Sequence, residues 1–409
     1  MKTIDKSISK LIWDNFIENK EGSTAYNLGR SAFFDIETTG LSPKGSSIYL
    51  IGVVYKVSED KASEENFSEE NPNCPYRIRQ WFADTYDSEK EILESFFSFL
   101  SEYDTLYSYN GKNFDVRFIE GRCENHDITI PEKIKELFHD NHIDIYREIC
   151  CLKNFLCLTG ARQKDFEVYL GLNREDMYSG KDLITKYSEY MTKKKFIISD
   201  KSIKKETDAL EEILLLHNFC DIEGMLILLP LIQIKNVIKT EDYDYFKRHI
   251  FDISCEEKSE EKSENYFKEN PEDNPRLLEI KCKLGEDSFF INYSLKLTLE
   301  NKELKYYISD YKNYYYLPSE DTIIHKSLAA FIDNSEKEKA TKDNCFLKKN
   351  GAFIVLNDYN KKTKAKKALM ENYRLFLDCK DNKTPETTYL ELETAKDKEL
   401  VCRLIYLYI

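Results

Sequence analysis

Apolar residues in the first part of the chain follow two different periods. Alternating runs rich in β-branched and aromatic residues predict strands at residues 31–37, 47–57, 76–85, 105–110 and 142–146. Apolar residues spaced three or four apart predict helices at residues 88–103, 112–124 and through most of 147–234. Strands first, then a strand between helices, then helices, predict an α/β fold in which a mixed sheet is flanked by helices.

A second pattern begins after residue 275. Strand-like runs occupy residues 277–284, 288–300, 304–318, 344–356, 388–394 and 400–409. The Asn350-Gly351 pair within one of them predicts a hairpin turn. Helical spacing predicts helices at residues 319–332, with Ser319 as N-cap, and at residues 364–377. Residues 276–409 are therefore expected to form a smaller α+β domain.

Composition sets the remaining boundaries. Residues 1–25 have the apolar spacing of an amphipathic helix, carried by Ile4, Ile8, Leu11, Ile12 and Phe16. Residues 251–275 are rich in Glu, Ser, Lys and Asn and too poor in apolar side chains to offset the entropy lost on ordering. We therefore expect an acidic linker at 251–275, which leaves residues 26–250 as the first domain.

Charge and cysteine content narrow the class of protein. The formal net charge of −14 argues against a protein that grips duplex nucleic acid over a broad basic face. No run of about 20 apolar residues predicts a membrane span. The 11 cysteines are an odd number, and no two of them form a C-x-x-C pair. Reduced thiols and a cytoplasmic location are the expectation.

Two acids interrupt the apolar strand FFDIETTGL. Asp35 and Glu37 are two residues apart, so on a strand their side chains point to the same face. Two carboxylates that close repel each other unless a cation lies between them, and a hard divalent ion is the natural partner of oxygen ligands. A solvated strand end, where acids at this spacing arise by chance, is the alternative explanation.

Two later segments add acids and a histidine. The segment YNGKNFDVRFI, residues 109–119, follows a predicted strand and places Asp115 near a helix start. The segment HNFCDIEGMLIL places His217 and Asp221 four positions apart, on one face of a helix. In this order the segments resemble the DEDD (DnaQ-like) 3′→5′ exonucleases of the RNase H-like superfamily. The similarity runs from about Phe33 to Ile232 and is greatest to the YprB-like subgroup.

The resemblance implies roles for these residues. Asp35, Glu37, Asp115 and Asp221 would bind two Mg²⁺ or Mn²⁺ ions, and His217 would be the base that deprotonates the attacking water. Residues beside the terminal nucleotide would be Thr38, Thr39, Gly40 and Leu41, with Asn110 shaping the turn before Asp115.

One spacing departs from the family pattern. Three residues separate His217 from Asp221, as in the branch of the family that uses a tyrosine at this place, whereas the histidine branch has four. This difference could shift the imidazole relative to the metal ions.

Three other clusters have two interpretations each. His139, His142 and Asp144 could bind metal, although a polar cluster at a strand end is the simpler explanation. The tyrosines of residues 306–316 could stack on bases, or form a half-buried aromatic strand pair. The lysines of residues 361–367, with Lys348 and Lys349, could hold a phosphate backbone or begin a charged helix.

The sequence thus predicts a two-metal 3′→5′ exonuclease that hydrolyses single-stranded DNA or RNA ends. Two alternatives remain open. The first is a non-catalytic nucleic-acid-binding or adaptor protein on an RNase H-like scaffold. The second is a structure-selective endonuclease. The expected partner is single-stranded nucleic acid, with no membrane, and the C-terminal domain is a candidate site for a protein partner.

Overall fold

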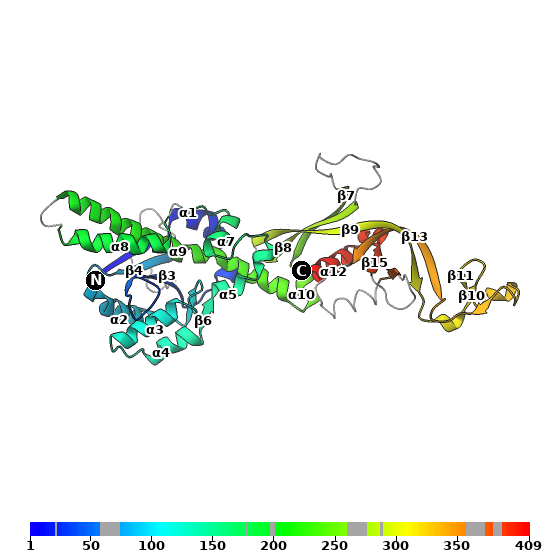
Figure 1. The fold of residues 1–409 in the computed structure, drawn as a ribbon, viewed down its shortest axis with the longest axis horizontal. Helices are drawn as coiled ribbons and strands as arrows, with labels where there is room; N and C mark the ends of the chain where they lie inside the picture. Colours follow the sequence, from blue (N-terminus) through cyan, green and yellow to red (C-terminus); the bar gives the residue numbers. More distant parts are fainter. Residues whose placement is uncertain are drawn as a thin grey trace. The chain divides into compact units, whose positions relative to one another are not determined.

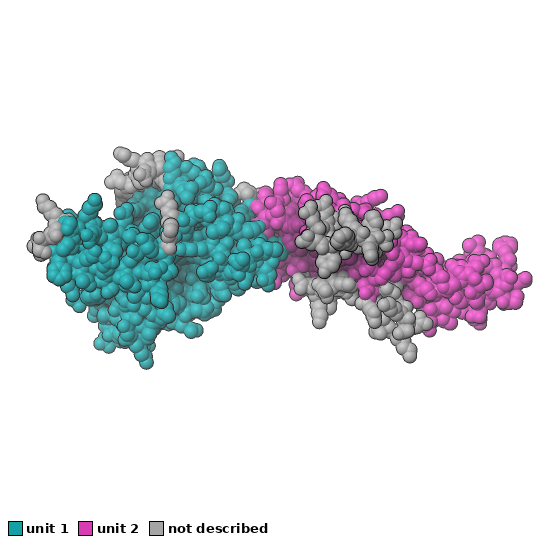
Figure 2. Space-filling model, turned by 45° about the horizontal axis from the view of Figure 1, so that its top comes forward, with its two compact units in different colours: residues 1–236, 287–289 teal, residues 237–286, 290–409 magenta. Residues whose placement is uncertain are grey.

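The chain forms two compact units. The computed structural model describes residues 1–20, 23–57, 74–174, 176, 178–196, 201–259, 276–286, 289–356, 373–378 and 387–409. Unit 1 comprises Met1–Asn236 with Asp287–Phe289, and unit 2 comprises Val237–Glu286 with Phe290–Ile409 (Figures 1 and 2). The boundary between the two units therefore lies after residue 236, inside a helix that spans Lys201–Lys239. Composition predicts a boundary at residue 250.

Unit 1 is built on a six-stranded mixed sheet with the order β1-β4-β3-β2-β5-β6. The first four strands of this order are antiparallel neighbours, whereas β2, β5 and β6 run parallel. The strands are β1 (Lys2–Ser7), β2 (Ser31–Thr38), β3 (Ile48–Lys56), β4 (Tyr76–Phe82), β5 (Thr105–Ser108) and β6 (His142–Asp144). The predicted mixed sheet is confirmed.

Helices cover both faces of this sheet (Figure 1). Alternation along β2 separates the faces: Phe34 packs on Phe96 and Phe138 on one side, while Asp35 meets Asn218 of the long helix on the other. The helices of unit 1 are α1 (Lys10–Ile12), α2 (Glu89–Leu100), α3 (Asp115–Asn125), α4 (Glu132–His139), α5 (Ile145–Ile149), α6 (Leu152–Phe155), α7 (Gln163–Tyr169), α8 (Gly180–Lys194) and α9 (Lys201–Lys239).

The long helix α9 is a core element. By length and hydropathy it could cross a membrane, but 72% of its most apolar window is buried inside the structure. Pro230 lies within it and has no N–H to donate to the carbonyl of Leu226, four residues earlier. The buried hydroxyl of Tyr26 donates to that carbonyl oxygen at 3.1 Å, so the helix continues past its proline without an unpaired acceptor.

The N-terminal segment differs from the prediction. Lys2–Ser7 is not part of a helix; it pairs with β4 as the edge strand β1. Helical turns follow from Lys10 to Lys20, and a short 3₁₀ turn lies at Thr24–Tyr26. The i, i+4 spacing of Ile4 and Ile8 is compatible with a helix, but a free edge of β4 offers backbone hydrogen bonds that local spacing cannot reveal.

Unit 2 contains two antiparallel sheets. The larger has the order β13-β15-β14-β9-β8-β7, and the smaller has the order β11-β10-β12. The strands are β7 (Ile250–Ser259), β8 (Arg276–Glu286), β9 (Phe289–Tyr307), β10 (Tyr314–Leu317), β11 (Thr322–His325), β12 (Glu338–Lys339), β13 (Phe346–Leu356), β14 (Leu375–Asp378) and β15 (Thr387–Glu391). The helices are α10 (Tyr243–Arg248) and α12 (Lys398–Tyr408).

Several local predictions for unit 2 are wrong. Residues 251–259, predicted as linker, lie in β7 and pair with β8, while residues 260–275 lie outside the described residues. The predicted hairpin turn is absent, because Asn350 and Gly351 lie inside β13 and pair with β9. Residues 400–409 lie mainly in α12, not in a strand.

The predicted helix at residues 319–332 is also wrong. Its first part is β11, which pairs in register with the tyrosines of β10. These tyrosines are half-buried in a strand pair, which agrees with the interpretation of the tyrosine run as an aromatic strand pair. Lys348 and Lys349 form ion pairs with Asp321 and Glu391, so their charges are already matched. Residues 361–367, and most of the second predicted helix, lie outside the described residues.

A buried ion pair ties α2 to α3 beneath the loop that follows β2. The Glu89 carboxylate accepts from Arg122 Nε at 2.8 Å and Nη2 at 2.6 Å, and from Ile48 N at 2.7 Å. Burial alone would raise the pKa of Glu89, but the hydrogen bonds from Arg122, His126 and Ile48 outweigh it and hold that pKa below its ordinary value. Arg122 also donates to the Pro43 carbonyl at 2.7 Å, which fixes the loop.

Replacing Glu89 by alanine should destabilise the protein strongly. The change leaves the Arg122 guanidinium buried without its carboxylate, which costs about 3–5 kcal/mol of unfolding free energy. The exposed Glu94 on the same helix is the matched control, and Glu94→Ala should change stability by less than about 0.5 kcal/mol. The ionised form of Glu89 is the one stabilised by folding. The difference between wild type and Glu89→Ala, measured by urea unfolding, should therefore shrink as pH falls through the lowered pKa.

His142 gives unit 1 a second pH dependence of the same sign, although here folding favours the neutral form of the side chain and not the ionised one. Its buried ring lies 2.7 Å from Ser108 Oγ through Nε2 and 3.2 Å from the Phe138 carbonyl through Nδ1. Burial lowers the pKa of His142 to about 4, so the folded protein holds the ring neutral.

The folded state should therefore lose stability where an unfolded histidine would gain a proton. Between pH 7.5 and 5.0 this contribution falls by about 2 kcal/mol, because the unfolded pKa is near 6.5. In His142→Gln, which keeps a donor and an acceptor but cannot titrate there, that part of the loss should disappear. Equal losses in wild type and variant, by urea unfolding at the two pH values, would contradict the assignment.

Candidate active site

The two acids of β2 lie where that strand loses its neighbour. β5 pairs with β2 only as far as Phe33, and the β2–β3 register shifts between Glu37 and Thr38. The backbone N–H of Ile36 therefore has no strand partner, and Asp115 Oδ1 accepts it at 3.2 Å. The carboxylate of Asp115, the first residue of α3, is in this way placed beside Asp35 and Glu37.

A tight turn sets the position of Asp115. Asn110 adopts a left-handed conformation with φ of +64°, which asparagine tolerates better than most residues. Asp144 at the end of β6 accepts from Asn110 N at 2.8 Å and from Lys112 N at 3.3 Å. The cluster of His142 and Asp144 is thus the polar strand-end arrangement, since both side chains bond to protein groups. His139 lies 2.8 Å from Glu120.

Helix α9 brings His217 and Asp221 to the same place. Nε2 of His217 lies 3.3 Å from Asp221 Oδ2 and 3.6 Å from Glu37 Oε1. The three side chains offer ligand atoms that all lie within 4.8 Å of one another, a spacing suited to a shared cation. The structure therefore brings together all five residues that the sequence singles out: Asp35, Glu37, Asp115, His217 and Asp221.

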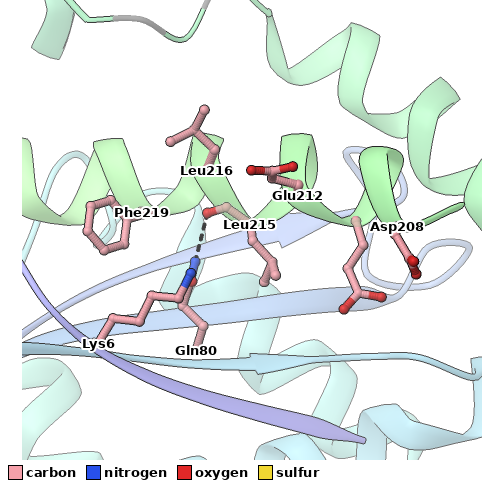
Figure 3. Close-up of a pocket in the computed structure, with 8 residues that line it drawn as sticks. Lys6, Gln80, Asp208, Glu212, Leu215, Leu216 and Phe219 are labelled. Atoms are coloured by element: carbon pink, nitrogen blue, oxygen red, sulfur yellow. Dashed lines mark hydrogen bonds between the residues drawn. The ribbon is translucent and has the colours of Figure 1, made fainter. Parts of the chain in front are cut away.

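Asn218 joins α9 to the strand that carries the acids. Its Nδ2 donates to Asp35 Oδ2 at 3.0 Å, and its Oδ1 accepts from Gln80 Nε2 at 2.9 Å. Gln80 also donates to the Leu215 carbonyl, the bond drawn in Figure 3. Gly52 lies opposite Asp35 on β3, and a Cβ there would meet Asn218 Oδ1 at 2.0 Å. This close approach requires glycine.

The acids raise one another's pKa. Burial is the main cause for Asp35 and Glu37, followed by repulsion from the neighbouring carboxylates, and both pKa values lie well above the ordinary range. For Asp115, burial and the charges of Asp144 and Asp221 outweigh the bond from Ile36 and raise the pKa to about 7. Bound divalent cations would reverse this effect, because they favour the ionised carboxylates. The donor set is all oxygen apart from one imidazole, which fits Mg²⁺ or Mn²⁺.

The loop between α7 and α8 supplies residues that sequence reasoning missed. Asp176 Oδ2 lies 2.7 Å from His217 Nδ1 and accepts from Lys164 Nζ at 2.9 Å. Arg174, whose side chain is 5% exposed, pairs with Asp221 Oδ1 and with Glu167. No periodic signal marks residues in such a loop. Asn218 could have been noticed, because it is a polar residue beside His217 within an apolar run.

The segment after β2 forms a compact turn. Thr38 Oγ1 donates to the Gly40 carbonyl at 2.8 Å, and Thr39 exchanges two bonds of 2.9 Å with Ser47. Leu41, at the tip, is 85% exposed. The turn is held by its own hydrogen bonds and presents an apolar side chain to solvent.

Comparisons with known proteins address the fold. A sequence model of the RNase H superfamily matches residues 32–228, which include all five clustered residues. No curated protein matches the chain. Among solved structures, the family B DNA polymerase from the hyperthermophilic archaeon Pyrobaculum calidifontis is similar, with 15% identity and a TM-score of 0.35 over 73% of this chain and 39% of the polymerase. With the matched residues and the mixed six-stranded sheet, unit 1 has an RNase H-like fold.

Proposed function

We propose that unit 1 is a metal-dependent nuclease that removes nucleotides from 3′ ends of single-stranded DNA or RNA, as the resemblance to the YprB-like DEDD exonucleases implies. One observation carries the proposal. Four carboxylates from β2, α3 and α9 converge with the His217 imidazole in one buried cluster. A scaffold without activity gains nothing from such repulsion, which counts against the adaptor alternative.

Asp35, Glu37, Asp115 and Asp221 would hold two Mg²⁺ or Mn²⁺ ions. When bound, such ions supply the positive charge that activates a water and stabilises the leaving oxygen of a phosphodiester. The protein's own contribution is to hold the carboxylates in place. Neutral donors do this for two of them: the Asn218 amide donates to Asp35 on β2, and the Ile36 N–H donates to Asp115 at the start of α3. Neither donor competes with a cation for charge.

His217 is suited to take a proton from the attacking water. Asp176 at Nδ1 favours the tautomer with the proton on that nitrogen, and in that tautomer the Nε2 lone pair faces Glu37 and Asp221. The spacing of His217 and Asp221 therefore keeps the imidazole at the carboxylate cluster, despite its departure from the histidine branch of the family. Asp176 sets the orientation of the ring, while the proton moves at Nε2.

The turn after β2 is suited to hold a terminal nucleotide. The exposed Leu41 can pack on a base, and Thr38 and Thr39 are held beside the acids by their bonds within the turn. Asn110, with its left-handed backbone, shapes the turn before Asp115. An unpaired end has the exposed base that such an apolar contact needs.

The test is cleavage of 5′-labelled oligonucleotides by the full-length protein in Mn²⁺. Wild type should shorten the strand from its 3′ end, whereas Asp35→Asn and Asp221→Asn should be slower by at least about 100-fold, because each removes charge that holds the ions. His217→Ala should lose about 10²–10⁴-fold through loss of the base. Glu212→Gln, an exposed acid of α9, is the control and should cleave as wild type does.

Two further measurements separate the alternatives. Calorimetric titration with Mn²⁺ should show binding that Asp35→Asn weakens, and an adaptor would show none. A circular single strand should resist wild type, since it offers no end. Metal-dependent cutting of the circle would instead identify an endonuclease, and equal cleavage by wild type and Asp35→Asn would reject the proposal altogether.

A further inference from the structure

A polar hollow lies against α3, the helix that begins with Asp115. It has a cavity volume of 270 Å³, and its charged walls are Lys112, Arg117, Glu120, His139 and Arg147. We call it the α3 hollow. Three of these side chains are permanent cations and one is an acid, in a chain whose net charge is −14. Such a local excess of positive charge is unexpected in an acidic protein and is a candidate anion-binding site.

The cations of the α3 hollow are only partly matched. Glu120 is 2.8 Å from His139, and Arg147 donates to Asn113 Oδ1 at 2.7 Å with its Nε 3.6 Å from Asp144. Within the described residues, no carboxylate pairs with the Lys112 ammonium or the Arg117 guanidinium. Two cationic groups at one hollow are therefore available to an anion from solution.

The hollow is rigidly connected to the acids. Lys112 belongs to the turn whose N–H groups bond Asp144, and Arg117 is two residues after Asp115 on α3. Successive helix positions are turned by about 100°, so Arg117 points away from the side of α3 that carries Asp115. The hollow and the carboxylates thus lie on two sides of one helix turn, within reach of one extended strand because a helix is about 10–12 Å across.

We infer that the α3 hollow binds a backbone phosphate of the substrate strand, with Lys112 and Arg117 as its ligands. The direction assigned here to the bound strand rests on the proposed function. If a nucleotide leaves from the 3′ end at the carboxylates, the rest of the strand lies on the 5′ side of the scissile bond. The phosphate in the hollow then belongs to that 5′ portion. Arginine and lysine on a groove are the usual phosphate ligands of single strands.

A hollow of unit 1 beside α9 has the wrong charge for this task. It lies between β1, β4 and α9, with a cavity volume of 450 Å³, and its walls include Asp208, Glu211 and Glu212 (Figure 3). Lys2 already pairs with Glu211 there. Carboxylates on α9 would repel a phosphate backbone, so the strand is expected to leave the acids across α3.

The test measures binding of 5′-labelled (dT)12 by anisotropy at several NaCl concentrations and one fixed Mg²⁺ concentration. The host is full-length Asp35→Asn, which should not cut the strand. Adding Lys112→Gln and Arg117→Gln should reduce the slope of log K against log salt by about 0.7, the value for one lost phosphate contact on a single strand. The swap Lys112→Arg with Arg117→Lys keeps both charges and should keep the slope.

A matched control removes two exposed lysines elsewhere on unit 1. Lys181→Gln with Lys205→Gln makes the same change in net charge, on α8 and α9. It should leave the slope as it is. A slope that falls equally in both double variants would overturn the inference, because it would report net charge and not a site. An unchanged slope in Lys112→Gln with Arg117→Gln would overturn it as well.

Cleavage kinetics separate this inference from the proposed function. In the otherwise wild-type protein, Lys112→Gln with Arg117→Gln should raise KM for (dT)12 about tenfold more than KM for thymidine 5′-(p-nitrophenyl phosphate), which has no further phosphate on its 5′ side. Equal changes in KM for both substrates would reject phosphate binding in the α3 hollow and leave the proposed nuclease activity supported. A salt slope that falls as expected in a protein that cleaves neither substrate would support the hollow and reject the nuclease.

Discussion

The repulsion between carboxylates packed into a poorly solvated cluster is the constraint to which unit 1 is adapted. Burial and mutual charge raise the pKa of Asp35 and Glu37 well above the ordinary range. A fold gains no stability from this arrangement. The fold must therefore hold the acids in place through neighbouring groups whose own positions do not depend on the acids. The mixed sheet does so, because the end of β5 exposes the Ile36 N–H that binds Asp115, and Gly52 leaves room for the Asn218 amide.

The acids of the site could be found in the sequence, whereas the residues around them could not. Acids at i and i+2 within an apolar strand, and His217 with Asp221 at i and i+4, depend only on local periodicity. Periodicity therefore predicts that each pair lies on one face of its element, and the resemblance to the DEDD exonucleases implies that the two pairs converge with Asp115. Arg174 and Asp176 lie in the loop between α7 and α8, where position depends on tertiary contacts with Glu167 and His217. Nothing in their spacing marks them.

The fold shows a similar division between local and tertiary signals. Strands and helices of unit 1 from β2 to α9 follow from local sequence signals. Helices such as α2 have one buried face and show helical spacing, whereas β3 is buried on both faces and shows a continuous β-branched and aromatic run. The failures are segments whose partners are distant in sequence. Lys2–Ser7 is a strand because β4 has a free edge, and Thr322–His325 is a strand because the tyrosines of β10 pair with it. In α12, β-branched and aromatic residues that favour strands form a helix with seven buried side chains, so burial overrides propensity.

An acidic protein can still attract a polyanion if its charges are segregated. The net charge of −14 sets the far field, but within a Debye length of about 8–10 Å the local groups dominate. Bound cations would offset the negative charge of the carboxylates in the cluster. Lys112 and Arg117 need no such change. Lys112 lies in the turn before α3, and Arg117 lies on α3, the helix that begins with Asp115. Without bound cations, the cluster would oppose a phosphate that the α3 hollow attracts. With them, both sides of α3 would carry the same sign, and nucleic-acid affinity would depend on metal ions even where no bond is cut.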